Sequence, residues 1–148
     1  MDKIFFMNEA INEAKKAYDK GETPIGAVIV KDSEVIGRGH NLTETLRDST
    51  AHAEMLAIKD ASETLGGWRL TDCDLYVTME PCIMCSGAIV NSRIKNIIIG
   101  TKHIKNANIE KQHTFKMEYF KDSRVEFGIM EDECSIILQR FFKDLRKK

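Results

Sequence analysis

Residues 75–100 constrain the fold of this 148-residue chain more than any other stretch. Residues 75–79 have the composition of a strand, residues 81–91 that of a helix, and residues 95–100 contain three consecutive isoleucines. Three isoleucines in a row are typical of a strand that is buried on both faces. Strand, helix and strand in this order form a βαβ unit, which predicts parallel strands joined by a right-handed crossover.

The rest of the chain supplies further helices and strands around this unit. Turn signals and hydrophobic periodicity predict a helix at 4–18, strands at 25–30 and 34–40, a polar loop at 41–50, a helix at 51–65, a crossover helix within 105–120, a strand at 125–127 and a helix from 131. We therefore expect a single domain over residues 1–148. Its predicted fold class is α/β, a three-layer α/β/α arrangement around a mainly parallel five-stranded sheet.

Periodicity also predicts which side chains of two helices are buried. The expected stripe of the 51–65 helix is Ala51, Met55, Ile58 and Leu65, and that of the last helix is Cys134, Ile137, Leu138, Phe141 and Leu145. Trp68, which follows Gly66-Gly67, is expected to cover the core rather than to stack on a base.

Charge and composition exclude several classes of protein. The net charge of −1 creates no global field toward nucleic acid, although a local basic patch could still bind it. No run of 18 apolar residues is present, so we expect no membrane span. The N-terminal apolar stretch is too short for a signal peptide and has acidic neighbours, which favours a cytoplasmic location.

Two short motifs about thirty residues apart carry the chemistry. They are His52-Ala53-Glu54 and Pro81-Cys82-Ile83-Met84-Cys85, each expected at the start of a helix. Cys82 and Cys85 are three residues apart, so both thiolates can face one point. Together with His52 they supply three ligands for one Zn²⁺ and leave the fourth tetrahedral position to water. Two helix N-termini would then converge on the metal, where their dipoles favour thiolates and hydroxide.

Glu54 completes the equipment for hydrolysis. Zinc lowers the pKa of bound water from ~15.7 to ~7, and a nearby carboxylate can take a proton from the water and return it to the substrate. Each motif alone has an ordinary alternative: a CxxC is often a redox pair or half of a zinc ribbon, and an HxE is often a solvated surface. Cys73 and Cys134 form no second CxxC, and we expect them to be packing residues.

Two further groups of residues keep both an ordinary and a functional interpretation. Asn41 lies in the polar loop before the HxE motif, where it is either a turn residue or a contact to a base or ribose. The basic C-terminus either complements the dipole of the last helix or contacts RNA. Its cations are Arg140, Lys143, Arg146, Lys147 and Lys148.

Over nearly its whole length the chain resembles the bacterial tRNA-specific adenosine deaminases of the cytidine deaminase-like superfamily. HxE with PCxxC is shared by zinc base deaminases in general. More particular matches are GETPIGAVIV (21–30), GHN (39–41), TAHAEMLAI (50–58), LYVTMEPCIMCSGAIV (75–90), SRI (92–94), DEC (132–134) and RFFKDLRKK (140–148).

This resemblance implies hydrolysis of adenosine to inosine at the wobble position of a tRNA anticodon. It implies Zn²⁺ on His52, Cys82 and Cys85, Glu54 as proton shuttle, and a homodimer in which both subunits contribute to binding the anticodon stem-loop. The substrate-binding residues that it implies are Asn41, Ala53 and Pro81, and those that it implies for RNA are Phe141, Phe142, Lys143, Arg146, Lys147 and Lys148.

One segment departs from the family pattern. After Gly100, where the family carries a glycine-rich loop, this chain has residues 101–111 with no glycine and with His103 in place of an acidic residue. Loops at the carboxyl ends of strands border ligand sites in open α/β sheets. The departure therefore leaves an alternative function open, in which the protein deaminates free nucleosides or bases such as guanine, cytosine or adenine compounds. A non-catalytic zinc-binding or redox protein is the alternative from another class.

Overall fold

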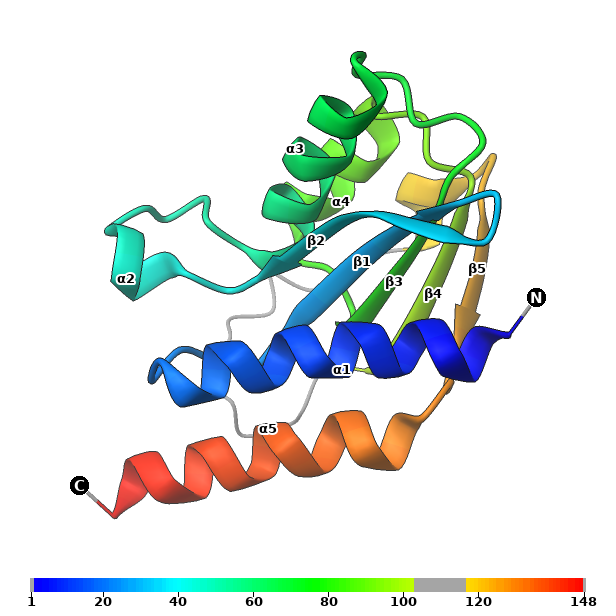
Figure 1. Ribbon diagram of the computed structural model, residues 1–148. Coiled ribbons are helices and arrows are strands. Elements are labelled where there is room, and N and C mark those ends of the chain that lie inside the picture. The colour runs from blue at the N-terminus through cyan, green and yellow to red at the C-terminus, as the bar shows by residue number, and fades with distance from the viewer. Residues whose placement is uncertain (1, 103–116, 148) are drawn as a thin grey trace.

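The computed structural model describes residues 2–102 and 117–147 (Figure 1). The elements in chain order are α1 (Lys3–Asp19), β1 (Gly26–Lys31), β2 (Glu34–His40), α2 (Thr43–Leu46), α3 (Ala53–Leu65), β3 (Asp74–Met79), α4 (Ile83–Asn91), β4 (Asn96–Thr101), the 3₁₀ helix η2 (Met117–Phe120), β5 (Arg124–Phe127) and α5 (Glu131–Arg146). All predicted strands are present. The predicted α/β class is confirmed.

The sheet has the strand order β2-β1-β3-β4-β5. β3, β4 and β5 pair in parallel, so the predicted parallel pairing of the 95–100 and 125–127 segments is confirmed. β1 is antiparallel to β2, to which the turn at Asp32 and Ser33 joins it, and it is also antiparallel to β3. Both turn residues have positive φ, 51° and 64°, as the tight hairpin turns that match strand twist require. The sheet is therefore mixed, with four strands in one direction and β1 in the other.

Helices cover both faces of the sheet (Figure 1). α1 and α5 lie on one face, and α3 and α4 lie on the other. Successive residues of β4 supply the two cores in turn: Ile97 and Ile99 pack under α3 and α4, whereas Ile98 packs under α1 and α5. The three isoleucines are thus buried on both faces, as predicted. Most of the helix predicted within 105–120 lies outside the described residues; residues 117–120 form η2.

Glycines in β2 bring α3 unusually close to the sheet. A Cβ at Gly37 would lie 2.5 Å from the carbonyl oxygen of Ala57, and one at Gly39 would lie 2.3 Å from that of Ala53. The face of α3 that meets the sheet consists of small residues, Ala53, Ala57 and Ala61, all fully buried. This corrects the predicted stripe. Ala51 is buried ahead of the helix, Met55 and Ile58 are half-buried and Leu65 is exposed.

Three smaller predictions are wrong. The predicted loop at 41–50 contains α2, which is stabilised by contacts from outside the loop. Trp68 is half exposed because α3 ends at Gly66 and the chain leaves the helix at the surface; the guanidiniums of Arg69 and Arg93 lie 4.4 and 5.6 Å from the centre of its ring. Leu145 is exposed near the end of α5, beyond the part of that helix that meets the sheet.

Candidate metal centre and active site

His52, Cys82 and Cys85 converge at the N-termini of two adjacent helices. His52 is the N-cap residue of α3, Cys82 is the N-cap residue of α4, and Cys85 lies in the first turn of α4. The Nδ1 atom of His52 is 3.5 Å from the Sγ atom of Cys82 and 3.6 Å from that of Cys85. Within residues 2–102 and 117–147 this is the one group of three or more His, Cys, Asp or Glu side chains placed to hold a metal ion.

The local sequence explains why α4 begins where it does. The Cys82 Sγ atom accepts a hydrogen bond from the backbone N–H of Cys85 at 3.5 Å, so this side chain caps the helix. Pro81 precedes the cap and is buried. The helix expected over residues 81–91 therefore begins at Ile83, and Pro81 lies just before its N-cap residue.

The separations of these atoms fit zinc. In a tetrahedral site with Zn–N of about 2.0–2.1 Å and Zn–S of about 2.3 Å, a nitrogen and a sulfur ligand lie about 3.6 Å apart. The two observed separations between nitrogen and sulfur, 3.5 and 3.6 Å, match this value. One nitrogen and two sulfurs are also a donor set that zinc binds well. Three protein ligands leave one tetrahedral position for a water molecule.

The two cysteines differ in charge. A hydrogen bond from the Cys85 thiol, supported by one from His52, lowers the pKa of Cys82 to about 4. The same bond to Cys82, together with burial, raises the pKa of the Cys85 thiol. The hydrogen bond to Cys82 raises the pKa of His52. Without a metal, Cys82 is therefore a thiolate held by two proton donors, and a divalent cation can replace those protons.

Glu54 lies beside this group, in the first turn of α3. It is 4% exposed, and burial raises the pKa of its carboxyl to about 7. The charge of Cys82 adds to this rise and that of His52 opposes it, because the carboxyl lies close to both ligands. A buried carboxyl next to a metal-ligand set is suited to exchange protons with a bound molecule. Ala53, between His52 and Glu54, is fully buried against Gly39 of β2.

Asn41 lies on a loop that returns directly to His52. Its backbone N–H donates to the Ile25 carbonyl at 3.2 Å, and its side-chain Oδ1 accepts from the Thr43 hydroxyl at 2.6 Å. The N–H of Leu42 donates to the carbonyl of Ala51 at 2.9 Å, which closes the loop next to the metal-ligand residue. The Oδ1 atom of Asn41 thus takes part in this turn, and the loop that carries Asn41 leads directly to His52.

Two buried carboxylates lie near this loop, and the sequence patterns did not single them out. Glu13 is 3% exposed and contacts the Nδ1 atom of His40 at 3.0 Å and the amine of Lys16 at 2.8 Å. Glu22 is 1% exposed and accepts hydrogen bonds from backbone N–H groups of α2. Helical periodicity places Glu13 near the buried face of α1 and Lys16 one turn after it, but nothing in the pattern predicts its contact with His40. The only sequence feature that points to Glu22 is its place in the GETPIGAVIV segment, which matches the family.

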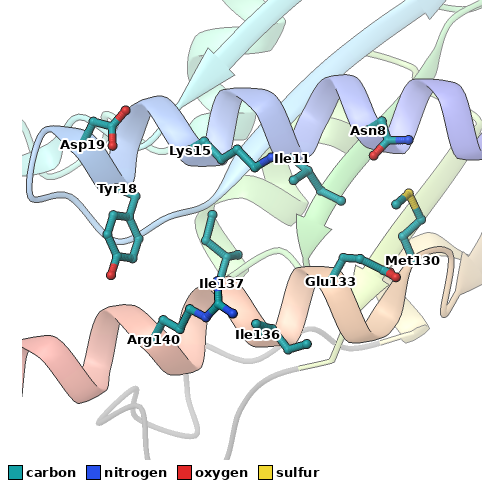
Figure 2. Close-up of a pocket in the computed structure, with 10 residues that line it drawn as sticks. All are labelled: Asn8, Ile11, Lys15, Tyr18, Asp19, Met130, Glu133, Ile136, Ile137 and Arg140. Atoms are coloured by element: carbon teal, nitrogen blue, oxygen red, sulfur yellow. The ribbon is translucent and has the colours of Figure 1, made fainter.

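A second concavity lies on the other face of the sheet. It is a groove of about 590 Å³ between α1 and α5, and Figure 2 shows Ile11 and Tyr18 on one side and Ile137 and Arg140 on the other. None of the described residues that line it is a cysteine or a histidine. Because α1 and α5 lie opposite α3 and α4 (Figure 1), this groove is separate from the metal centre.

The residues expected to contact RNA lie on α5. Phe141 packs edge-on against Tyr18 of α1, with ring centres 5.8 Å apart, and Phe142 packs against Phe141. Lys143, Arg146 and Lys147 are exposed. Lys148 and residues 103–111 of the departing loop lie outside the described residues. Helices in the described part of the chain are all too short or too polar to cross a membrane.

Comparison with known proteins agrees with this geometry. Residues 1–146 match the family model of the MafB19-like deaminases. The chain is 47% identical to the tRNA-specific adenosine deaminase of Bacillus subtilis strain 168, over 97% of this chain and 90% of that protein. It is 46% identical to the tRNA-specific adenosine deaminase of Aquifex aeolicus, over 99% of this chain and 97% of that protein.

Solved structures of deaminases are also similar to this chain. A structure from studies of A-to-I editing by tRNA:A34 deaminases at the wobble position superposes with a TM-score of 0.77 and 39% identity, covering 90% of this chain and 99% of that one. Guanine deaminase from Bacillus subtilis superposes with a TM-score of 0.67 and 42% identity over 70% of this chain and 66% of that one. The chain therefore belongs to the MafB19-like deaminases and, within them, to the group of the tRNA-specific adenosine deaminases.

Proposed function

We propose that this protein hydrolyses adenosine to inosine at the wobble position of a tRNA anticodon, using a Zn²⁺ ion on His52, Cys82 and Cys85. The observation that carries the proposal is the convergence of these three ligands beside the buried Glu54. Similarity to tRNA-specific adenosine deaminases over nearly the full length of the chain supports adenosine in tRNA as the substrate.

The reaction consumes water and releases ammonia. When bound, zinc supplies hydroxide at neutral pH, because it lowers the pKa of water to ~7. Glu54 takes a proton from the attacking water and delivers protons to the ring nitrogen and to the departing amine. His52, Cys82 and Cys85 hold the ion at the N-termini of α3 and α4, where both helix dipoles favour the negative charge of the nucleophile. Asn41, Ala53 and Pro81 border the base.

The RNA would extend from this site over the basic end of α5. Its exposed cations Lys143, Arg146 and Lys147, with Lys148 next in the sequence, are suited to phosphate contacts. Phe141 is engaged with Tyr18, so we assign it to holding α5 in place and assign the phosphate contacts to the cations.

We also propose that the protein is a homodimer that uses the outer face of α4. Ile83 and Val90 are 47% and 38% exposed, and they flank the exposed Gly87 at helical spacing. Such an apolar stripe beside the metal centre is typical of a protein contact surface. Light scattering coupled to size exclusion tests this, and Val90→Glu should convert a dimer into a monomer.

One experiment separates the candidate substrates. The purified protein is offered an anticodon stem-loop with adenosine at the wobble position, free adenosine, cytidine and guanine, and both ammonia and the deaminated product are measured. We expect inosine in the stem-loop and little product from the others. Guanine is included because of the similarity to guanine deaminase. Faster turnover of any free compound than of the stem-loop would contradict the proposal.

A further inference from the structure

A buried carboxylate outside the metal centre holds the loop that leads into it. Glu22 lies between α1 and β1 and is 1% exposed. Its Oε1 atom accepts a hydrogen bond from the backbone N–H of Glu44 at 3.1 Å, and its Oε2 atom accepts one from that of Thr45 at 2.6 Å. Both donors belong to α2, in the middle of residues 41–52. Glu22 therefore binds the loop from the α1 side.

The Glu22 carboxylate is charged at neutral pH. Burial opposes its ionisation, but hydrogen bonds from the side chain and backbone of Thr45 and from Glu44 outweigh burial and lower the pKa of Glu22. Hydrogen bonds to a charged acceptor are stronger than neutral ones, and a buried charge that loses them is costly. The backbone of α2 is therefore held firmly at this point.

The loop carries this constraint to the metal centre. The Oδ1 atom of Asn41 accepts from the hydroxyl of Thr43, which begins α2. Leu42 is bonded to Ala51, the residue before His52. Asn41 and His52 thus lie at the two ends of a closed loop, and Glu22 holds its middle. The hydrogen bonds of Glu22 go to the backbone of the loop and not to the side chains of the metal ligands.

We propose that Glu22 is a positioning residue for substrate binding: it keeps the 41–52 loop, with Asn41 on it, in the arrangement that receives the target nucleoside beside the metal centre. This inference rests on the proposed function, because it takes that loop as a border of the substrate site. Glu22 acts on substrate affinity, whereas the proton transfers remain with Glu54. Loss of Glu22 should therefore change KM more than kcat.

Two variants of Glu22 and one control test this. In Glu22→Ala we expect the KM for the stem-loop to rise about tenfold, the effect of losing a charged hydrogen-bond acceptor, while kcat stays within about threefold. Glu22→Gln retains one acceptor oxygen and should show a smaller rise in KM. Glu34→Gln, an exposed carboxylate in the β1–β2 hairpin, should match the wild type. Zinc content, measured in each variant, should not change.

Hydrogen exchange tests the same inference without substrate. The backbone amides of Glu44 and Thr45 should lose protection in Glu22→Ala and keep most of it in Glu22→Gln. Unchanged protection of these two amides, or a KM within about twofold of the wild type in Glu22→Ala, would overturn the inference. So would a parallel loss of kcat and zinc, which would mark Glu22 as a general structural residue. A wild-type protein that makes no inosine would contradict the proposed function instead, and hydrogen exchange would then decide on Glu22.

Discussion

His52 and Cys82 occupy the N-cap positions of two different helices, and the Nδ1 atom of His52 lies 3.5 Å from the Sγ atom of Cys82. The two residues are thirty positions apart in the chain. Their meeting depends on the packing of α3 beside α4 on one face of the sheet (Figure 1). The metal-ligand set is therefore a product of tertiary structure, although each of its parts is recognisable as a short motif.

Zinc content gives the first prediction. The purified protein should hold about one Zn²⁺ per chain, and Cys82→Ala should lose most of it because only two protein ligands remain. Cys73→Ala is the matched control, since Cys73 is also a free cysteine but is not part of the ligand group. Elemental analysis measures the metal. A zinc-free wild type, or a disulfide between Cys82 and Cys85, would contradict this prediction.

Replacement of Glu54 separates metal binding from catalysis. Glu54→Gln should keep the fold and the zinc, and its turnover should fall ~10²–10⁴-fold or more, because Glu54 serves more than one proton transfer. The control is Glu63→Gln, an exposed carboxylate on the same helix. Single-turnover assays on the stem-loop provide the rate. A Glu54→Gln variant with a tenth of wild-type activity would remove Glu54 from this role.

Glycine substitutions test the close packing of α3 on β2. Gly39→Ala places a methyl group 2.3 Å from the carbonyl oxygen of Ala53, so we expect it to lower the free energy of unfolding by about 1–3 kcal/mol. Gly67→Ala meets no atom within 4 Å and should change it by less than about 0.5 kcal/mol. Urea unfolding followed by circular dichroism measures both. Equal stability of the two variants would show that α3 can move away from β2 at little cost.

From the contacts of Glu13 we predict that the folded protein loses stability in acid. Burial raises the pKa of Glu13, but hydrogen bonds and charges from Lys16 and His40 outweigh burial, and the net effect lowers it below the usual 4.5. A carboxyl with a lowered pKa in the folded state stabilises the protein above its unfolded pKa, and this stabilisation is lost as pH falls through the folded pKa. The free energy of unfolding should therefore decline below about pH 4.5 more steeply in the wild type than in Glu13→Gln.

The difference between the two curves is the quantity to measure, because other carboxyls also titrate in this range. Urea unfolding between pH 3 and pH 7 supplies it, with Glu34→Gln as an exposed control. Curves that stay parallel over the whole range would show that Glu13 has the same pKa in the folded and unfolded protein.

Deletion of residues 146–148 tests the basic end of α5. Each phosphate contact that is lost should reduce the slope of log K against log salt by ~0.7–0.9 and weaken binding of the stem-loop. Turnover of free adenosine, if measurable, should not change, because a single nucleoside is too small to bridge the metal centre and the tail. Unchanged affinity and slope would leave these cations as partners of the α5 dipole alone.

The sequence predicts those parts of the molecule whose signal is local. Three isoleucines in β4 predict a strand buried on both faces, and HxE with CxxC predicts the ligand set, because these residues need few neighbours to be interpreted. The buried face of α3 was missed, since it is decided by Gly37 and Gly39 in a different element. Small residues face the sheet there, and their low hydrophobicity conceals the contact.

Glu22 illustrates a second kind of miss. Its partners are backbone N–H groups of residues 44 and 45, which every non-proline residue possesses. No pairing of side-chain types in the sequence can indicate such a contact. Trp68 was mispredicted for another reason: α3 ends at Gly66 and the chain leaves the helix at the surface, where Arg93 from a distant turn lies near the indole ring.

The position of the three ligands at two helix starts also affects how the protein opens. His52 begins a helix that packs on the β1–β2 hairpin, whereas Cys82 and Cys85 begin the helix that joins β3 to β4. An ion held by all three would tie the first turns of both helices together, so that neither turn could fray by itself. The hairpin half and the crossover half of the sheet would then exchange their amides as one cooperative unit when the metal is bound, and as two when it has been removed.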